Sequence, residues 1–152
     1  MLKFDPTEST GYLVGRVAHI LQLRVQEFLD EADIDMTAQE ISVLTVVAHL
    51  KKPEQMKRLA EMCGRDATTV SRQIASLENA GLVKRSSSPD DGRFNVVSIT
   101  KKGQRLVERT IPMTLVLRKR AMSGISPADA KALPRALKQM LDNLNLGDQS
   151  QH

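Results

Sequence analysis

Hydroxyl and guanidinium side chains recur along one predicted helix, from about Asp66 to Ala80. Val70, Ile74 and Leu77 recur there at helical spacing and predict an inward-facing apolar stripe. The outer face then carries Arg65, Thr68, Thr69, Arg72 and Ser76. Arginine can donate two hydrogen bonds to guanine, and threonine can meet a base edge or a thymine methyl group. These side chains suit the major groove of double-stranded DNA, although a solvated surface helix can carry the same residue types.

A shorter predicted helix and a turn precede this one. Apolar residues from Leu59 onward stop at Gly64, which can adopt the positive φ that ends a helix. Asp66 is a suitable N-cap, because its carboxylate can accept the backbone amide of Thr68 or Thr69. The segment therefore predicts a helix-turn-helix.

A predicted β-hairpin follows the second helix. Leu82 and Val83 begin one strand, Val97 lies in the next, and Asp91-Gly92 favours a tight hairpin between them. Positive side chains lie on its stem and tip, at Lys84, Arg85 and Arg93. Such groups suit DNA phosphates, and an arginine at the tip suits a narrow minor groove.

These segments together resemble winged-helix transcription factors of the multiple-antibiotic-resistance regulator (MarR) type. The resemblance lies in LAEMCGRDATTVSRQIASLENAGLVKR, in SPDDGR with its Asp91-x-Arg93 signature, and in VVSITKKG before a long helix. It implies that the helix near residues 66–80 enters the major groove, that Arg93 enters the minor groove and that Asp91 braces the wing. Phe94 beside the wing tip and Cys63 in place of an aliphatic residue depart from the family pattern.

The expected fold is mainly α with a small β-wing (α+β), in a single domain over residues 1–152. A winged helix-turn-helix is expected at residues 37–102, a helical dimerisation region at residues 9–34 and 103–146, and a flexible tail at residues 147–152. Thr37 and Glu40, three positions apart, predict a capping box at the first helix of the winged segment. The N-terminal helix, capped at Ser9 or Thr10, is apolar over so broad an arc that it must bury two faces, one of them against a second copy of the chain. Pro112 should kink the long helix after the wing, and Pro134 should bend or break the last helix.

Dimerisation and the resemblance together imply a mode of action. A two-fold homodimer should read an inverted-repeat operator with half-sites about one DNA turn apart. Members of the family commonly repress promoters and are released by a small-molecule effector, so the resemblance implies a repressor. Two alternatives remain: a winged-helix module that docks another protein, and an architectural protein that binds DNA without sequence preference.

Other ligands receive weaker support from the sequence. Tyr12, Arg16, His19 and His49 could hold an anionic or phenolic effector, or they could be ordinary interface and surface groups. Cys63 could sense oxidants if nearby cations lower its pKa, but packing as a small apolar group is the favoured interpretation.

Composition narrows the possible functions further. The chain has 152 residues, 41% hydrophobic and 26% charged, which is enough for one core. Residues 1–50 hold 3 basic and 8 acidic groups, a net charge of −5, whereas residues 51–152 hold 19 and 10, a net charge of +9. One basic lobe suits an approach to phosphates. The sequence shows no membrane span, signal peptide, metal-ligand cluster or catalytic motif, so we expect a cytoplasmic protein with no cofactor and no enzymatic activity.

Overall fold

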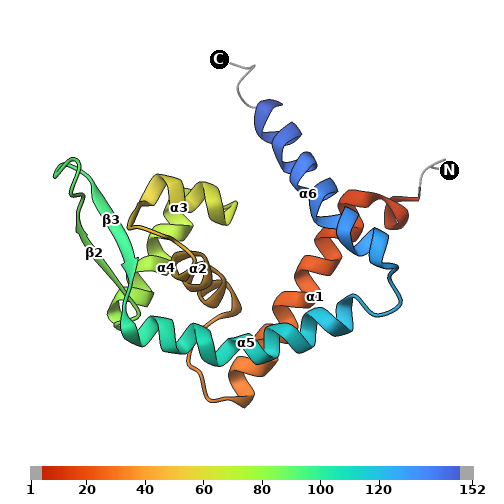
Figure 1. Ribbon diagram of the computed structural model, residues 1–152, viewed down its shortest axis with the longest axis horizontal. Helices are drawn as coiled ribbons and strands as arrows, with labels where there is room; N and C mark the ends of the chain where they lie inside the picture. Colours follow the sequence, from red (N-terminus) through yellow and green to blue (C-terminus); the bar gives the residue numbers. More distant parts are fainter. Residues whose placement is uncertain (1–4, 148–152) are drawn as a thin grey trace. The chain divides into compact units, whose positions relative to one another are not determined.

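The chain folds into six α-helices and three β-strands over residues 5–147, the part that the computed structural model describes (Figure 1). The elements are a 3-10 turn (Pro6–Glu8), α1 (Thr10–Glu31), α2 (Ala38–Ala48), β1 (Glu54–Gln55), α3 (Met56–Cys63), α4 (Ala67–Asn79), β2 (Val83–Ser87), β3 (Asn95–Ile99), α5 (Lys101–Ala121) and α6 (Pro127–Gly147). The described residues form two compact units, one ending at Leu115 and one beginning at Val116. A mainly helical fold with a small β-wing is therefore confirmed.

The sheet is antiparallel and has the strand order β1-β3-β2. Within the hairpin, Arg85 lies opposite Val97. On the other side of β3, Glu54 of β1 also lies opposite Val97. Strand β1 was not predicted from the sequence, because a strand of two polar residues carries no apolar alternation.

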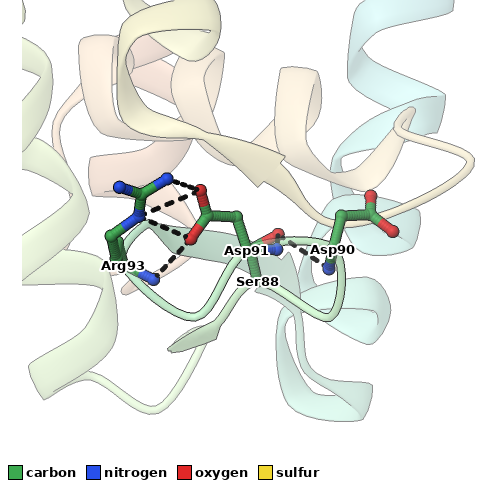
Figure 2. Close-up of polar contacts among 4 residues, drawn as sticks. All are labelled: Ser88, Asp90, Asp91 and Arg93. Atoms are coloured by element: carbon green, nitrogen blue, oxygen red, sulfur yellow. Dashed lines mark hydrogen bonds and ion pairs between the residues drawn. The ribbon is translucent and has the colours of Figure 1, made fainter.

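The hairpin loop is longer than the sequence predicted. Seven residues, 88–94, separate β2 from β3, so the expected tight hairpin is wrong. Asp91-Gly92 instead lies in a turn inside this loop, where the amide of Phe94 donates to the carbonyl of Asp91 at 3.1 Å. Pro89 has no N–H for a strand ladder, and the hydroxyl of Ser88 accepts the amides of Asp90 and Asp91. Figure 2 shows Ser88 beside Asp90 in this loop, whose two ends are joined where the amide of Ser88 donates to the carbonyl of Phe94 at 2.7 Å.

A single core unites the elements from α2 to β3, which we call the winged lobe. Its fully buried side chains come from α2, α3, α4 and the hairpin, and include Leu44, Leu59, Ile74 and Val97. Leu29, near the end of α1, joins the same core with no exposed surface. The hairpin projects from these helices (Figure 1).

Side-chain caps fix the start of three helices where the sequence predicted them. Ser9 accepts the amide of Tyr12 at the start of α1. Thr37 and Glu40 form the reciprocal capping box of α2. Asp66 caps α4. These caps set the residue at which each helix begins.

The junction between the wing and α5 is tightly packed. The hydroxyl of Thr100 donates to the carbonyls of Gly81 and Leu82, and it accepts the amide of Gly103. Gly103 is buried so close to the carbonyl oxygen of Leu82 that a Cβ atom would overlap it. The start of α5 is therefore fixed to the base of β2.

Both terminal helices continue through their prolines. α5 includes Pro112 and α6 includes Pro134, so of the bend or break predicted at Pro134 the break does not occur. In α5 the hydroxyls of Thr110 and Thr114, on either side of Pro112, donate to the carbonyl oxygens of Val107 and Thr110 in the turn before the proline. Of the predicted tail, only Gly147 lies within the described residues, and it ends α6. Among the described helices, none combines the length and apolar character that crossing a bilayer demands.

Candidate nucleic-acid interface

Helix α4 presents a polar face because its apolar stripe is fully buried. Val70, Ile74 and Leu77 have no exposed surface. The opposite face exposes Thr68, Arg72 and Ser76, and Thr69 is half-buried beside them. Within residues 5–147, the guanidinium of Arg72 makes no hydrogen bond or ion pair. These side chains form an open donor and acceptor surface, as a groove-reading helix requires.

The start of α4 is held by the turn that precedes it. Gly64 adopts φ 61°, a left-handed conformation that glycine permits, and ends α3. The carboxylate of Asp66 then accepts the amide of Thr69 at 2.8 Å. Hydrogen bonds from Thr69 lower the pKa of Asp66, and the charge of Arg72 contributes. The predicted helix-turn-helix is therefore present, with its predicted cap.

Arg65 lies at the side of this face, next to α2. Its guanidinium Nη1 donates to Gln73 Oε1 at 3.2 Å and to the carbonyl of Gln39 at 3.5 Å. The side chain is half-buried. Arg65 thus joins the turn to α2 and α4, whereas it was predicted to lie on the outward face.

The wing carries Arg93 on its exposed loop, and Asp91 holds it (Figure 2). The carboxylate of Asp91 accepts the Arg93 Nε at 3.1 Å, the Nη2 at 2.8 Å and the backbone amide at 3.1 Å. The Arg93 side chain is 86% exposed and that of Asp91 is 34% exposed. These bonds lower the pKa of Asp91 and raise that of Arg93. Asp91 thus orients a guanidinium that still faces solvent.

The two stem cations of the wing differ. The guanidinium of Arg85 pairs with Glu78 Oε2 at 3.3 Å, and its Nη2 donates to the carbonyl of Ser71 at 3.4 Å. Both partners belong to α4, so Arg85 fastens the wing to this helix. Lys84, opposite Ser98 in the sheet, is exposed.

The four predicted effector residues come from two elements. Tyr12, Arg16 and His19 are exposed on one face of α1, with the Arg16 guanidinium 5.9 Å from the centre of the Tyr12 ring. His49 is the exposed C-cap of α2. The three α1 residues are thus one group, and His49 lies at the end of another helix.

Cys63 packs beside the core of the winged lobe. It is half-buried at the end of α3. Burial raises the pKa of its thiol, and the charge of Arg65 offsets only part of that effect. A raised pKa lowers the thiolate fraction, so these surroundings favour the packing interpretation over oxidant sensing. Among residues 5–147, no cluster of three His, Cys, Asp or Glu side chains suits a metal ion.

Two residues beside the predicted face were missed. Gln73 follows Thr69 by four positions and precedes Ser76 by three, a spacing that places it on the same side of α4. Gln39, in the first turn of α2, contacts it through a side-chain hydrogen bond at 3.2 Å. Helical spacing could have identified Gln73, but only the folded chain brings Gln39 beside it.

Comparison with known proteins places this geometry in a family. A family described as "Winged helix DNA-binding domain" matches residues 36–103. The chain is 35% identical over 88 residues to the HTH-type transcriptional regulator YxaD of Bacillus subtilis, a match that covers 57% of this chain and 62% of YxaD, less than two thirds of its length. It is 30% identical over 112 residues to YdcH of the same organism, covering 71% of this chain and 74% of YdcH. It is 32% identical over 77 residues to the HTH-type transcriptional repressor IacR of Pseudomonas putida, covering 51% of this chain and 46% of IacR.

Solved structures share the whole fold at low identity. A MarR-family regulator from Rhodococcus sp. RHA1 aligns with a TM-score of 0.77 at 20% identity, over 90% of this chain and 95% of that one. The S. aureus MepR–DNA complex gives 0.75 at 21%, over 89% and 98%. Bordetella bronchiseptica BpsR, whose DNA binding is regulated by 6-hydroxynicotinic acid, gives 0.78 at 24%, over 93% and 99%. With the helix-turn-helix and the braced wing, the YdcH match shows that the chain belongs to the winged-helix HTH-type transcriptional regulators, and its fold is that of MarR-family structures.

Proposed function

We propose that the chain acts as a homodimer that binds an inverted-repeat operator and represses transcription until a small molecule releases it. The observation that carries the dimer is the apolar surface of α1. Leu13, Val17, Ile20 and Leu23 are between 42% and 55% exposed on successive turns of this helix. A run of large exposed apolar side chains marks an interaction surface, and a second copy of the chain offers the same surface.

The DNA contacts follow from α4 and the wing. We assign α4 to the major groove, where Arg72 can bond guanine and Thr68, Thr69 and Ser76 can meet base edges. Arg93 enters the adjacent minor groove with Asp91 as its brace. Lys84 contacts phosphate, while Arg65 and Arg85 keep their bonds within the lobe and contribute positive potential.

Two such lobes in a two-fold dimer give the expected operator. Each copy reads one half-site, and the half-sites lie about one DNA turn apart. The relative IacR is a repressor, which supports the direction of regulation, and the MepR complex with DNA supports the binding mode. A repressor with this geometry acts in the compartment that holds the DNA, which is the cytoplasm of a bacterium.

Release by an effector requires a ligand that binds one arrangement of the dimer better than another. The 6-hydroxynicotinic acid that regulates BpsR is a hydroxylated aromatic acid, and it supports an anionic or phenolic effector. On this chain, Arg16 and His19 could meet a carboxylate and Tyr12 could stack on an aromatic ring. His49 is a separate candidate at the end of α2.

The test is selection of bound duplexes from a random pool, with the wild type, Arg72→Ala and Arg93→Ala in parallel. Lys131→Ala, which removes one exposed positive charge from α6, is the matched control. We expect one inverted repeat, with altered base preference for Arg72→Ala, weaker binding for Arg93→Ala and no change for the control.

The same experiment decides between the alternatives. A random wild-type pool that is retained only at low salt would indicate an architectural protein, because released counterions tie nonspecific binding to ionic strength. No retention even at low salt would indicate a winged-helix module that docks another protein. Either result contradicts the proposal.

A further inference from the structure

The side-chain amide of Gln73 is fixed at both ends by residues outside α4. Its Oε1 accepts Arg65 Nη1 at 3.2 Å, and its Nε2 donates to Gln39 Oε1 at 3.2 Å. Arg65 lies in the turn and Gln39 lies in α2, so three separate segments meet at one carboxamide.

Arg65 determines the orientation of the Gln73 side-chain amide, that is, which of its partners faces the oxygen and which faces the nitrogen. A guanidinium has donors and no acceptor, so it can bond only the oxygen of Gln73. The Nε2 of Gln73 must then point to Gln39, whose own oxygen accepts it. Without Arg65, a rotation of the amide by 180° would exchange oxygen and nitrogen, since Gln39 can offer either group.

Gln39 is itself held in place. It belongs to the first turn of α2, where the amide of the neighbouring Ala38 donates to Gln26 Oε1 at 2.8 Å. The Nε2 of Gln26 donates to the carbonyl of Met36 at 3.2 Å. This reciprocal clamp from α1 fixes the start of α2, and with it the partner of Gln73.

Gln73 keeps hydrogen-bonding capacity beyond these two contacts. Its Nε2 has a second hydrogen and its Oε1 has a second lone pair. The residue is half-buried on the side of α4 that carries Thr69 and Ser76, next to the exposed Arg72. A donor and an acceptor side by side match N7 and N6 of adenine in the major groove.

We propose that Gln73 is a specificity-determining residue that reads one adenine in each half-site, with Arg65 and Gln39 as its positioning residues. The inference rests on the proposed function, because it requires α4 to enter the major groove. It goes beyond that function by naming a base and a residue that reads it. It also gives Arg65 a role through Gln73 in place of direct base contact.

Duplex selection tests the inference with Gln73→Glu, Arg65→Ala and Arg65→Lys beside the wild type. Gln73→Glu removes the donor, and a carboxylate accepts from N4 of cytosine, so the adenine should change to cytosine at one symmetric position. The wild-type site should then bind Gln73→Glu at least about tenfold more weakly, while the cytosine site binds it better. Arg65→Ala should lose the adenine preference at that position alone, and Arg65→Lys, which also has only donors, should restore it.

Two controls separate reading from a merely structural role. Gln22→Glu makes the same chemical change at an exposed position of α1 and should leave the motif unchanged. Thermal unfolding of each variant should stay near that of the wild type. A structural role would weaken all duplexes equally and would not be rescued by the base change.

A wild-type motif that Gln73→Glu leaves unchanged, or weakens uniformly, would overturn this inference and leave the proposed function intact. A wild-type pool without any motif would overturn both. A cytosine preference in Gln73→Glu together with an Arg65→Ala motif identical to wild type would support Gln73 as the reader and refute Arg65 as its positioning residue.

Discussion

The winged lobe buries its large apolar side chains, whereas the N-terminal two thirds of α1 expose theirs to solvent. The lobe buries Leu44, Leu59 and Ile74 completely. In α1, Leu13 is 46% exposed and Val17 is 55% exposed. The lobe therefore has a core of its own, whereas the large apolar side chains of this part of α1 remain exposed among the described residues 5–147.

The two ends of α1 also differ in how far their apolar side chains are buried. Near its C-terminal end, Leu29 is fully buried, and Val25 and Phe28 pack against the core of the lobe. One helix thus belongs to the lobe at one end and presents an apolar surface at the other. A helix of this kind can pass a change at a subunit interface directly to a DNA-binding lobe.

The largest expected effect comes from breaking the lobe. Gly103→Ala places a methyl group against the carbonyl oxygen of Leu82. This oxygen belongs to the backbone, so it can move away only at a large cost in free energy. We expect the free energy of unfolding to fall by about 3 kcal/mol, measured by chemical denaturation, with loss of DNA binding.

A matched glycine supplies the control. Gly11→Ala lies in α1 with nothing near the new methyl group, and it should raise the unfolding free energy by up to about 1 kcal/mol because alanine favours helix. Equal effects of the two substitutions would contradict the packing described at the wing junction.

The next largest effect separates the two regions. Val17→Glu places a charge on the exposed face of α1, so it should abolish the proposed dimer without unfolding the lobe. Affinity for the two-half-site operator should fall roughly 100-fold, because the second lobe no longer binds as part of the same molecule. Light scattering would measure the molar mass of the variant, and titration with the operator duplex would measure its affinity.

Gln22→Glu is the matched change on the other side of α1, and it should leave both quantities unaltered. A Val17→Glu protein that remains dimeric would refute the assignment of this face to the subunit interface.

Sequence predicted what depends on neighbouring residues in the chain. The buried stripe of α4 follows from the spacing of Val70, Ile74 and Leu77, and the caps at Thr37 and Asp66 use bonds to residues three positions away. The polar face of α4 could be located for the same reason.

What sequence could not predict depends on contacts between distant segments. Arg65 bonds Gln39, which is 26 positions away, and Arg85 bonds Glu78 and Ser71 of another element. None of these three partners can be inferred from helical spacing. The loop from residue 88 to 94 escaped prediction for a local reason, because the hydroxyl of Ser88 accepts the amides of Asp90 and Asp91 inside the loop.

A smaller effect sharpens the contrast within the lobe, between a cation fixed inside it and one exposed to solvent. Arg85→Ala removes the pair with Glu78 and should lower the unfolding free energy by up to about 1 kcal/mol. Lys84→Ala should leave stability unchanged but reduce the slope of log affinity against log salt by about 1, since one phosphate contact is lost. Chemical denaturation measures the unfolding free energy, and DNA titration at several salt concentrations measures the slope. A reversed assignment of these effects would show that the stem cations exchange roles on DNA.

The smallest expected effect concerns the hydrogen bonds between Asp91 and Arg93 in the wing, because the protonation of the Asp91 carboxylate can be followed directly. Bonds from Arg93 hold the pKa of Asp91 below its ordinary value of 3.8, so the carboxylate is charged wherever the brace forms. A lowered folded-state pKa means that the brace contributes fully above 3.8 and is lost only as pH falls through the lower, folded value. DNA affinity should therefore not change through Asp91 between about pH 6 and pH 8. An NMR titration of the Asp91 carboxyl carbon should give a midpoint below 3.8, and Arg93→Ala should move that midpoint upward. If the titration midpoint of Asp91 is the same in Arg93→Ala as in the wild type, Asp91 does not hold this arginine in solution. The wing would then present a freely moving guanidinium to the minor groove.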